Sequence, residues 1–308
     1  MSSLMPRLDR ATRTFWRTVG RPVDLGGAER WLDAPVHDGA TIGDHWLEAE
    51  AARLGGTLVE DPAAGLIPDL AALDGPAFRA RDLAPEVRDF YEHTAGWRME
   101  VWTQWNTLFQ PGGELVSRYF GRRVHQLALP TRPLDVAHGM DSRVVAILDP
   151  SGQQQAAGWL RTLRSSGGYV YSGCYSSRTL PGSRQPSVHV AFPLEAGNVQ
   201  VFLRPAVLPG GGLELRSPAG GFGQDGAYVL AGDGDRAGCG PQDSARDSTG
   251  FSTRDSARVG RPYAARVPIH EHFRVYVDDE GVLRTDHLLQ LWSATVLRLH
   301  YKLTPSSA

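Results

Sequence analysis

Apolar and polar residues alternate along most of the second half of the chain, from Arg143 to Leu303, with turn sequences between the alternating segments. A period of two residues predicts β-strands with one buried face. The predicted strands are 143–149, 156–164, 168–176, 187–194, 198–205, 212–216, 227–231, 263–278 and 282–303, the last in one or two pieces. Short links between so many strands indicate antiparallel neighbours, and a sheet of this size is expected to curl.

The first part of the chain has a different period. Apolar residues recur at three- and four-residue steps over 87–108, which predicts a long helix that begins at Pro85 and ends before Pro111. Shorter helices are predicted at 4–19, 44–54 and 114–120. We therefore expect an α+β protein in which a mainly helical N-terminal part, 1–142, packs on a large antiparallel, curled or barrel-like sheet, 143–308, in one integrated domain.

One segment interrupts the alternating half. Residues 233–261 are rich in Gly, Asp, Ser and Arg and contain almost no apolar side chains. This composition predicts a disordered insertion between two strands, because such a segment cannot bury enough apolar surface to fold. The insertion and the predicted helix 4–19 are the segments that could recruit a protein partner, whose identity the sequence does not give.

The composition excludes several functional classes. A net charge of −2 over 308 residues predicts no general affinity for nucleic acid or anionic membranes. The chain has no run of 18 apolar residues, so no membrane-spanning helix is expected. Two cysteines do not indicate a disulfide scaffold and favour a cytoplasmic location. Lys302 is the one lysine, which argues against Schiff-base chemistry and a phosphate-binding P-loop.

The predicted strand 263–278 carries the residues most suggestive of chemistry. His270 and His272 lie two apart and share one side of the strand with Tyr276. With a third ligand from a neighbouring strand, this pair could hold a divalent metal, although solvent-facing histidines are the simpler interpretation and no cofactor is expected. Glu271 lies on the opposite, apolar side, where a carboxylate is costly unless paired. It is a candidate for proton transfer if that side lines an interior, and a partner for an arginine otherwise.

Other candidates are scattered along the chain. His138 and Asp141 lie in a predicted loop before the first strand of the sheet, and such loops often carry catalytic residues. Side chains that could line a ligand pocket are the aromatic ones at regular spacing, namely Tyr169, Tyr171, Tyr175, Trp97, Trp105 and Tyr276. Weaker candidates are His189, Asp286, His287 and His300.

Three functions stay open at this point. The first is binding of a small apolar or aromatic molecule, lipid-like or a biosynthetic intermediate, inside a barrel-like sheet. The second is a cofactor-independent or metal-assisted enzyme, such as a cyclase, isomerase or hydrolase, that uses His270, His272 and Glu271. The third is a protein-interaction module. The observation that most sharply separates them is which face of the strand 263–278 points inward.

Overall fold

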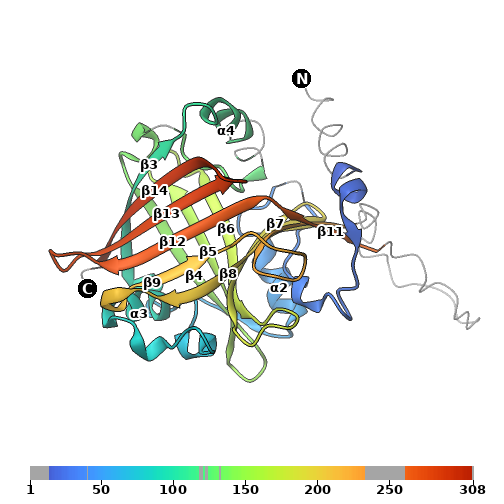
Figure 1. Cartoon of the computed structure of the whole chain (residues 1–308), viewed down its shortest axis with the longest axis horizontal. Helices are drawn as coiled ribbons and strands as arrows, with labels where there is room; N and C mark the ends of the chain where they lie inside the picture. The colour runs from blue at the N-terminus through green and yellow to red at the C-terminus, as the bar shows by residue number, and fades with distance from the viewer. Residues whose placement is uncertain are drawn as a thin grey trace, which may run out of the picture.

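An antiparallel sheet that folds over on itself dominates the computed structural model (Figure 1). The structure describes residues 14–39, 41–117, 121, 124–131, 133–232 and 261–306. The strands are β1 (Arg21–Pro22), β2 (Thr57–Val59), β3 (Trp97–Trp105), β4 (Met140–Leu148), β5 (Gln154–Leu163), β6 (Tyr169–Arg178), β7 (Ser187–Leu194), β8 (Gly197–Val207), β9 (Leu213–Arg216), β10 (Gly226–Ala231), β11 (Tyr263–Val267), β12 (Ile269–Val277), β13 (Leu283–Leu291) and β14 (Ala294–Pro305).

Neighbouring strands follow the order β2-β4-β5-β6-β7-β8-β9-β12-β13-β14-β3. In the described part of the chain the end strands β2 and β3 do not pair with each other, so the sheet is not closed. β8 divides the sheet, because its first half pairs with β10 and its last residues pair with β9. From β10, a side branch of the sheet continues through β11 to β1.

The prediction of an antiparallel sheet over the second half of the chain is confirmed. Each predicted strand has a counterpart among β4 to β14, and two of the predicted segments are divided. Pro268 separates β11 from β12, because proline has no N–H group to donate to a neighbouring strand. A tight turn at Trp292, whose φ is 53°, separates β13 from β14.

The long helix predicted after Pro85 is wrong for most of its length. Helix α3 (Pro85–Glu92) is followed by a 3₁₀ turn (Thr94–Gly96) and then by β3, which pairs with β14 along nine residues. Trp97, Met99 and Val101 are buried on one face of β3, and the residues between them are exposed. The segment therefore also fits a period of two, and its tryptophans, valine and threonine favour a strand. Pairing with the end of the sheet decides between the two patterns.

The remaining helices are short. Helix α2 (Trp46–Arg53) corresponds to the predicted helix 44–54, and α4 (Gln110–Val116) overlaps the start of the predicted helix 114–120. Short 3₁₀ turns lie at Arg30–Leu32, Leu70–Leu73, Ala80–Asp82, Pro133–Val136 and Pro209–Gly211. In Figure 1, α3 and α4 lie near opposite ends of β3.

Three hydrophobic clusters hold the sheet and its covering segments together. The largest lies in the space enclosed by the folded sheet and receives side chains from the 64–101 region and from most strands. The second packs α2 against the outer side of β4, β5 and β6. The third surrounds Trp31, Phe202 and Tyr228 at the branch of the sheet. The candidate site belongs to the first cluster.

Two predicted segments fall mainly outside the described residues. Residues 14–19 of the predicted helix 4–19 are helical, and residues 4–13 are not described. Of the predicted disordered insertion 233–261, only the final residue lies in the described part of the chain.

Candidate functional site

The two faces of β12 separate the residues that the sequence places together. Glu271 and Phe273 line a cavity inside the folded sheet. His270 and His272 point the other way, where His270 Nδ1 lies 3.0 Å from the Ser217 carbonyl oxygen and His272 Nε2 lies 2.8 Å from Glu214 Oε1. The histidine pair and Glu271 therefore do not form one site.

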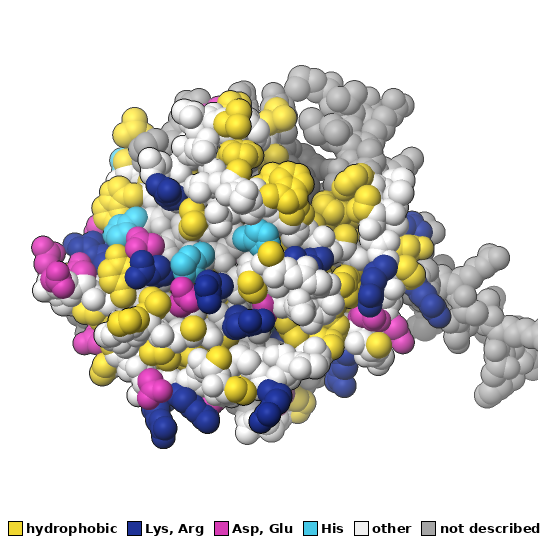
Figure 2. All heavy atoms as spheres, viewed as in Figure 1, with side chains coloured by type: hydrophobic (Ala, Val, Ile, Leu, Met, Phe, Trp, Pro, Cys, Tyr) yellow, Lys and Arg dark blue, Asp and Glu magenta, His cyan; other side chains and the backbone are white. Residues whose placement is uncertain are grey.

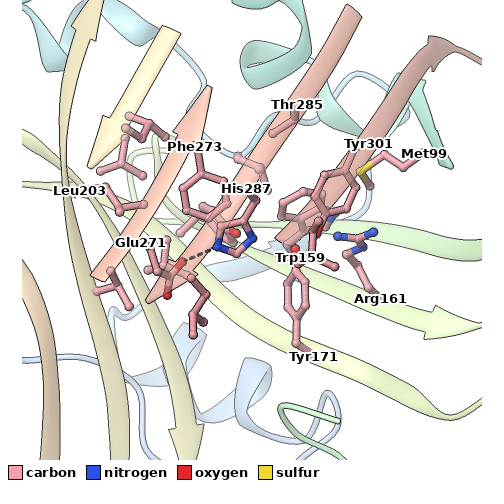
Figure 3. A pocket seen from close by; sticks show the side chains of 18 of the residues that line it. Met99, Trp159, Arg161, Tyr171, Leu203, Glu271, Phe273, Thr285, His287 and Tyr301 are labelled. Atoms are coloured by element: carbon pink, nitrogen blue, oxygen red, sulfur yellow. Dashed lines mark hydrogen bonds and ion pairs between the residues drawn. The ribbon is translucent and has the colours of Figure 1, made fainter. Parts of the chain in front are cut away.

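The cavity has a volume of about 150 Å³ and lies inside the folded sheet (Figure 3). Side chains from β3, β5 to β9 and β12 to β14 line it, and α3 and two segments outside the strands complete its wall with Leu66, Phe90, Tyr91, Leu127 and Leu129. The lining is mostly aliphatic and aromatic. Its polar members are Tyr91, Arg161, Tyr171, Tyr175, Glu271, Thr285, His287 and Tyr301.

Glu271 forms a pair with His287 of the adjacent strand β13. The distance from His287 Nε2 to Glu271 Oε2 is 3.1 Å, and the side chains are 12% and 15% exposed. The pairing register places Phe273 opposite His287, and the two rings stack with centroids 3.8 Å apart. The partner of this partly buried carboxylate is thus a histidine. From the sequence alone, an arginine is the alternative partner expected.

In the view of Figure 3, Arg161 of β5 lies on the opposite side of the cavity from Glu271. Its side chain is surrounded by Trp159, Tyr171 and Tyr301, with the guanidinium carbon 5.4, 5.4 and 5.0 Å from the three ring centroids. Burial raises the pKa of Tyr171 to about 12, an effect that the charge of Arg161 partly offsets. Burial also raises the pKa of Tyr175 well above its ordinary value. Both phenols are therefore neutral at pH 7.

The aromatic candidates divide into lining and non-lining residues. Tyr171 and Tyr175 line the cavity, whereas Trp97 and Trp105 pack in the surrounding core without reaching it. Tyr169 does not share the side of Tyr171. A β-bulge lies between these residues, because Arg161 pairs with Tyr171 and the next residue of β5 pairs with Tyr169. Tyr169 consequently stacks on His125 at the outer side of the sheet.

The loop candidates lie elsewhere. His138 is exposed, and Asp141, at the start of β4, is exposed and forms an ion pair with Arg164 at 2.8 Å. Neither residue lines the cavity. His138 and Asp141 are therefore not brought together with Glu271, His270 or His272.

The outer face of β12, β13 and β14 carries a groove of about 490 Å³ that includes His272 and His300. Figure 2 shows histidines here among arginines and acidic side chains. In this groove Asp286 accepts two hydrogen bonds, one from His300 at 2.8 Å and one from the Tyr276 hydroxyl at 3.1 Å. Within the described ranges, no three His, Cys, Asp or Glu side chains are grouped to hold a metal ion.

His189 has a different environment from the other histidines. It is fully buried between Ser176 Oγ at 3.0 Å and Gln200 Oε1 at 2.9 Å and stacks on Phe202. Burial lowers its pKa to about 3, so the ring is neutral in the folded protein. An unfolded chain protonates the same histidine near pH 6.5. The stability that this histidine contributes is therefore complete above about pH 6.5 and is lost as the pH falls toward 3.

We expect the His189→Gln variant to show a weaker dependence of stability on pH than the unmodified protein. Between about pH 6.5 and pH 5, we expect the free energy of unfolding to fall by about 2 kcal/mol more in the unmodified protein than in the variant. Urea unfolding at both pH values measures it. His138→Gln, which changes an exposed histidine, is the control and should keep the original slope. Equal slopes for both variants and the unmodified protein would contradict the buried neutral state of His189.

Arg161, Trp159 and Phe273 are cavity residues that the sequence did not identify. The sequence does place Trp159 and Arg161 on one face, because they lie two apart on a predicted strand. This spacing did not distinguish Arg161 from other arginines, since the chain has 31 of them and most strands carry polar residues on one side.

Comparison with known proteins adds little to this picture. No protein-family model matches the chain, and no solved structure matches it. An uncharacterized membrane protein, YndJ of Bacillus subtilis (strain 168), is 25% identical over 142 residues, which is 46% of this chain. The match covers 25% of YndJ, so the chain spans about a quarter of that relative's length. The similarity alone assigns no family. Across the described residues, every helix is too short or too polar to span a bilayer.

Proposed function

We propose that the protein binds a small apolar or aromatic molecule in the cavity enclosed by its sheet. The observation that carries the proposal is a void bounded by aliphatic and aromatic side chains with a few polar groups at defined positions. Ligand sites in proteins have this composition, because apolar contacts supply affinity and isolated polar groups fix orientation. The barrel-like enclosure of the sheet is part of the same proposal.

The volume limits the size of the ligand. Drug-sized ligands occupy sites of roughly 300–1,000 Å³, whereas an apolar cavity of about 150 Å³ can accept benzene. At about 150 Å³, the cavity here suits a single aromatic ring or a short branched chain. A long lipid chain does not fit without movement of the lining side chains.

The walls also favour an aromatic ring. Trp159 meets Tyr171 and Tyr175 edge to face, with centroid distances of 5.7 and 5.4 Å. Across the cavity, Phe273 is stacked on His287. Rings in edge-to-face and offset arrangements attract one another beyond the effect of their buried area. A ligand ring between these walls would extend the same packing.

An enzyme that uses acid–base chemistry is the alternative proposal. The specific observation in its favour is the Glu271–His287 pair, which combines a carboxylate and an imidazole at 3.1 Å on the wall of the cavity. A carboxylate in contact with an imidazole is an arrangement that general acid–base catalysis uses. The alternative differs from the original hypothesis in that His287 takes the place of His270 and His272.

Toluene is a suitable probe for the binding proposal because it is neutral and has a single ring. Mass action predicts that toluene raises the thermal unfolding midpoint of the unmodified protein, and that the rise grows with the logarithm of the toluene concentration once the cavity is mostly occupied. The variant Leu203→Trp places an indole in the cavity and should abolish this rise. The matched control is Leu288→Trp, because Leu288 lies on the outer face of β13 in the groove of His272. An identical rise in both variants would contradict binding inside the sheet.

A further inference from the structure

Arg161 is a charged side chain buried beside the cavity, and none of the acidic residues that the structure describes forms an ion pair with it. It is 2% exposed, and in the part of the chain that the structure describes its Nε atom makes no hydrogen bond. Its Nη2 atom lies 3.8 Å from the sulfur of Met140, which is a weak acceptor. The Nε–H group is therefore a buried donor without a partner in the described part of the chain, whereas the phenols of Tyr171 and Tyr301 are hydrogen-bond partners of the guanidinium group.

The surrounding residues hold the cation but do not neutralise it. The rings of Trp159, Tyr171 and Tyr301 give cation–π contacts, which are attractive but leave the charge in place. Glu271 is the one acidic residue among the described residues that line the cavity, and it is already paired with His287. A buried charge without a counter-ion is unfavourable, so the site favours occupation by an anion.

From these contacts we propose that the ligand of the cavity carries a carboxylate that pairs with Arg161, so that the ligand class is a small aromatic or branched aliphatic carboxylic acid. The inference rests on the proposed binding function and makes it more specific. A guanidinium group matches a carboxylate through two parallel hydrogen bonds, which a planar arginine side chain provides better than other cations. The protonated phenol of Tyr171, next to Arg161, is a further donor to the same carboxylate.

The charges of the cavity also set the orientation of the ligand. Glu271 would repel a second anion at its own side of the cavity, whereas Arg161 attracts one at the other. The carboxylate is therefore expected at Arg161 and the apolar part near Phe273 and Leu203.

Benzoate, benzamide and toluene test the inference on the unmodified protein. Benzamide has nearly the shape of benzoate but no charge, and toluene tests the apolar cavity alone. We expect benzoate to bind about 10- to 100-fold more tightly than benzamide in calorimetric titrations, as charge-assisted hydrogen bonds in a buried site predict. Comparable binding of benzoate and benzamide, with toluene also bound, would overturn the inference and leave the proposed function standing. Failure of all three compounds to bind would overturn both.

The variant Arg161→Met removes the charge and keeps an apolar side chain of similar length. It should lose the preference for benzoate, retain toluene binding within about threefold and unfold at a higher temperature than the unmodified protein when no ligand is present. The control Arg164→Met changes an exposed arginine just beyond the end of β5 and should keep the preference. If Arg161→Met fails to fold, the benzoate and benzamide comparison still decides the inference. A preserved preference in Arg161→Met would contradict it.

Discussion

Replacement of Trp46 by alanine is expected to lower the free energy of unfolding by about 3–5 kcal/mol, the range for truncation of a large buried aromatic side chain. Trp46 is 0% exposed and is the largest side chain of the cluster that packs α2 on the sheet. Its indole Nε1 donates a hydrogen bond to Ser172 Oγ at 2.7 Å. The close approach is possible because Gly158 lies beneath α2, where a Cβ atom would come within 2.5 Å of Leu47.

Urea unfolding of the variant measures this effect. The matched control is Trp102→Ala, because Trp102 is 51% exposed on the outer face of β3 and should change the free energy of unfolding by less than about 0.5 kcal/mol. Trp46→Phe retains most of the packing and is expected to fall between the two. Equal destabilisation by Trp46→Ala and Trp102→Ala would show that α2 does not pack on the sheet as described.

The second large effect is expected for Gln126→Leu. Gln126 is fully buried where the pairing of β6 with β7 stops, because the residue of β7 that would follow in register opposite Ser172 is Pro193, which has no N–H group. The Gln126 amide replaces the missing bonds. It donates to the carbonyl oxygens of Ser172 at 2.7 Å and Pro193 at 3.3 Å, and it accepts from the N–H of Ser172 at 2.9 Å.

Leucine keeps the volume of this side chain but leaves the buried N–H and C=O groups of Ser172 without partners. Each buried unsatisfied group costs about 1–3 kcal/mol, so we expect a loss of about 2–6 kcal/mol in the free energy of unfolding. Because Leu127 and Leu129 line the cavity, detachment of their segment should also weaken toluene binding. Gln155→Leu, at an exposed glutamine hydrogen-bonded to Asp149, is the control. A free energy of unfolding for Gln126→Leu within about 0.5 kcal/mol of the unmodified value would contradict this role.

The period-two pattern predicted most of the sheet because each strand of the second half buries one face. Its failures have physical causes that a local pattern does not contain. Residues 97–105 satisfy both a helical and a two-residue period, and only pairing with β14 selects the strand. The bulge that separates Tyr169 from Tyr171 is a property of two strands and not of one sequence segment.

The candidate site was predictable in part for the same reason. Alternation alone placed Glu271 on the opposite face of its strand from His270 and His272, as the structure has it. It could not identify His287 as the partner of Glu271, because that contact depends on the register between β12 and β13. That Arg161 has no ion pair with the described acidic residues was equally hidden, since it depends on how the strands are placed in three dimensions.

A crystal structure of the unmodified protein grown with toluene would show whether a small ring binds inside the folded sheet. We expect electron density for one ring inside the sheet, bounded by Trp159, Tyr171 and Phe273, with the surrounding strands unchanged. An interior filled by its own side chains, or toluene found only in the outer groove beside His272 and His300, would contradict it.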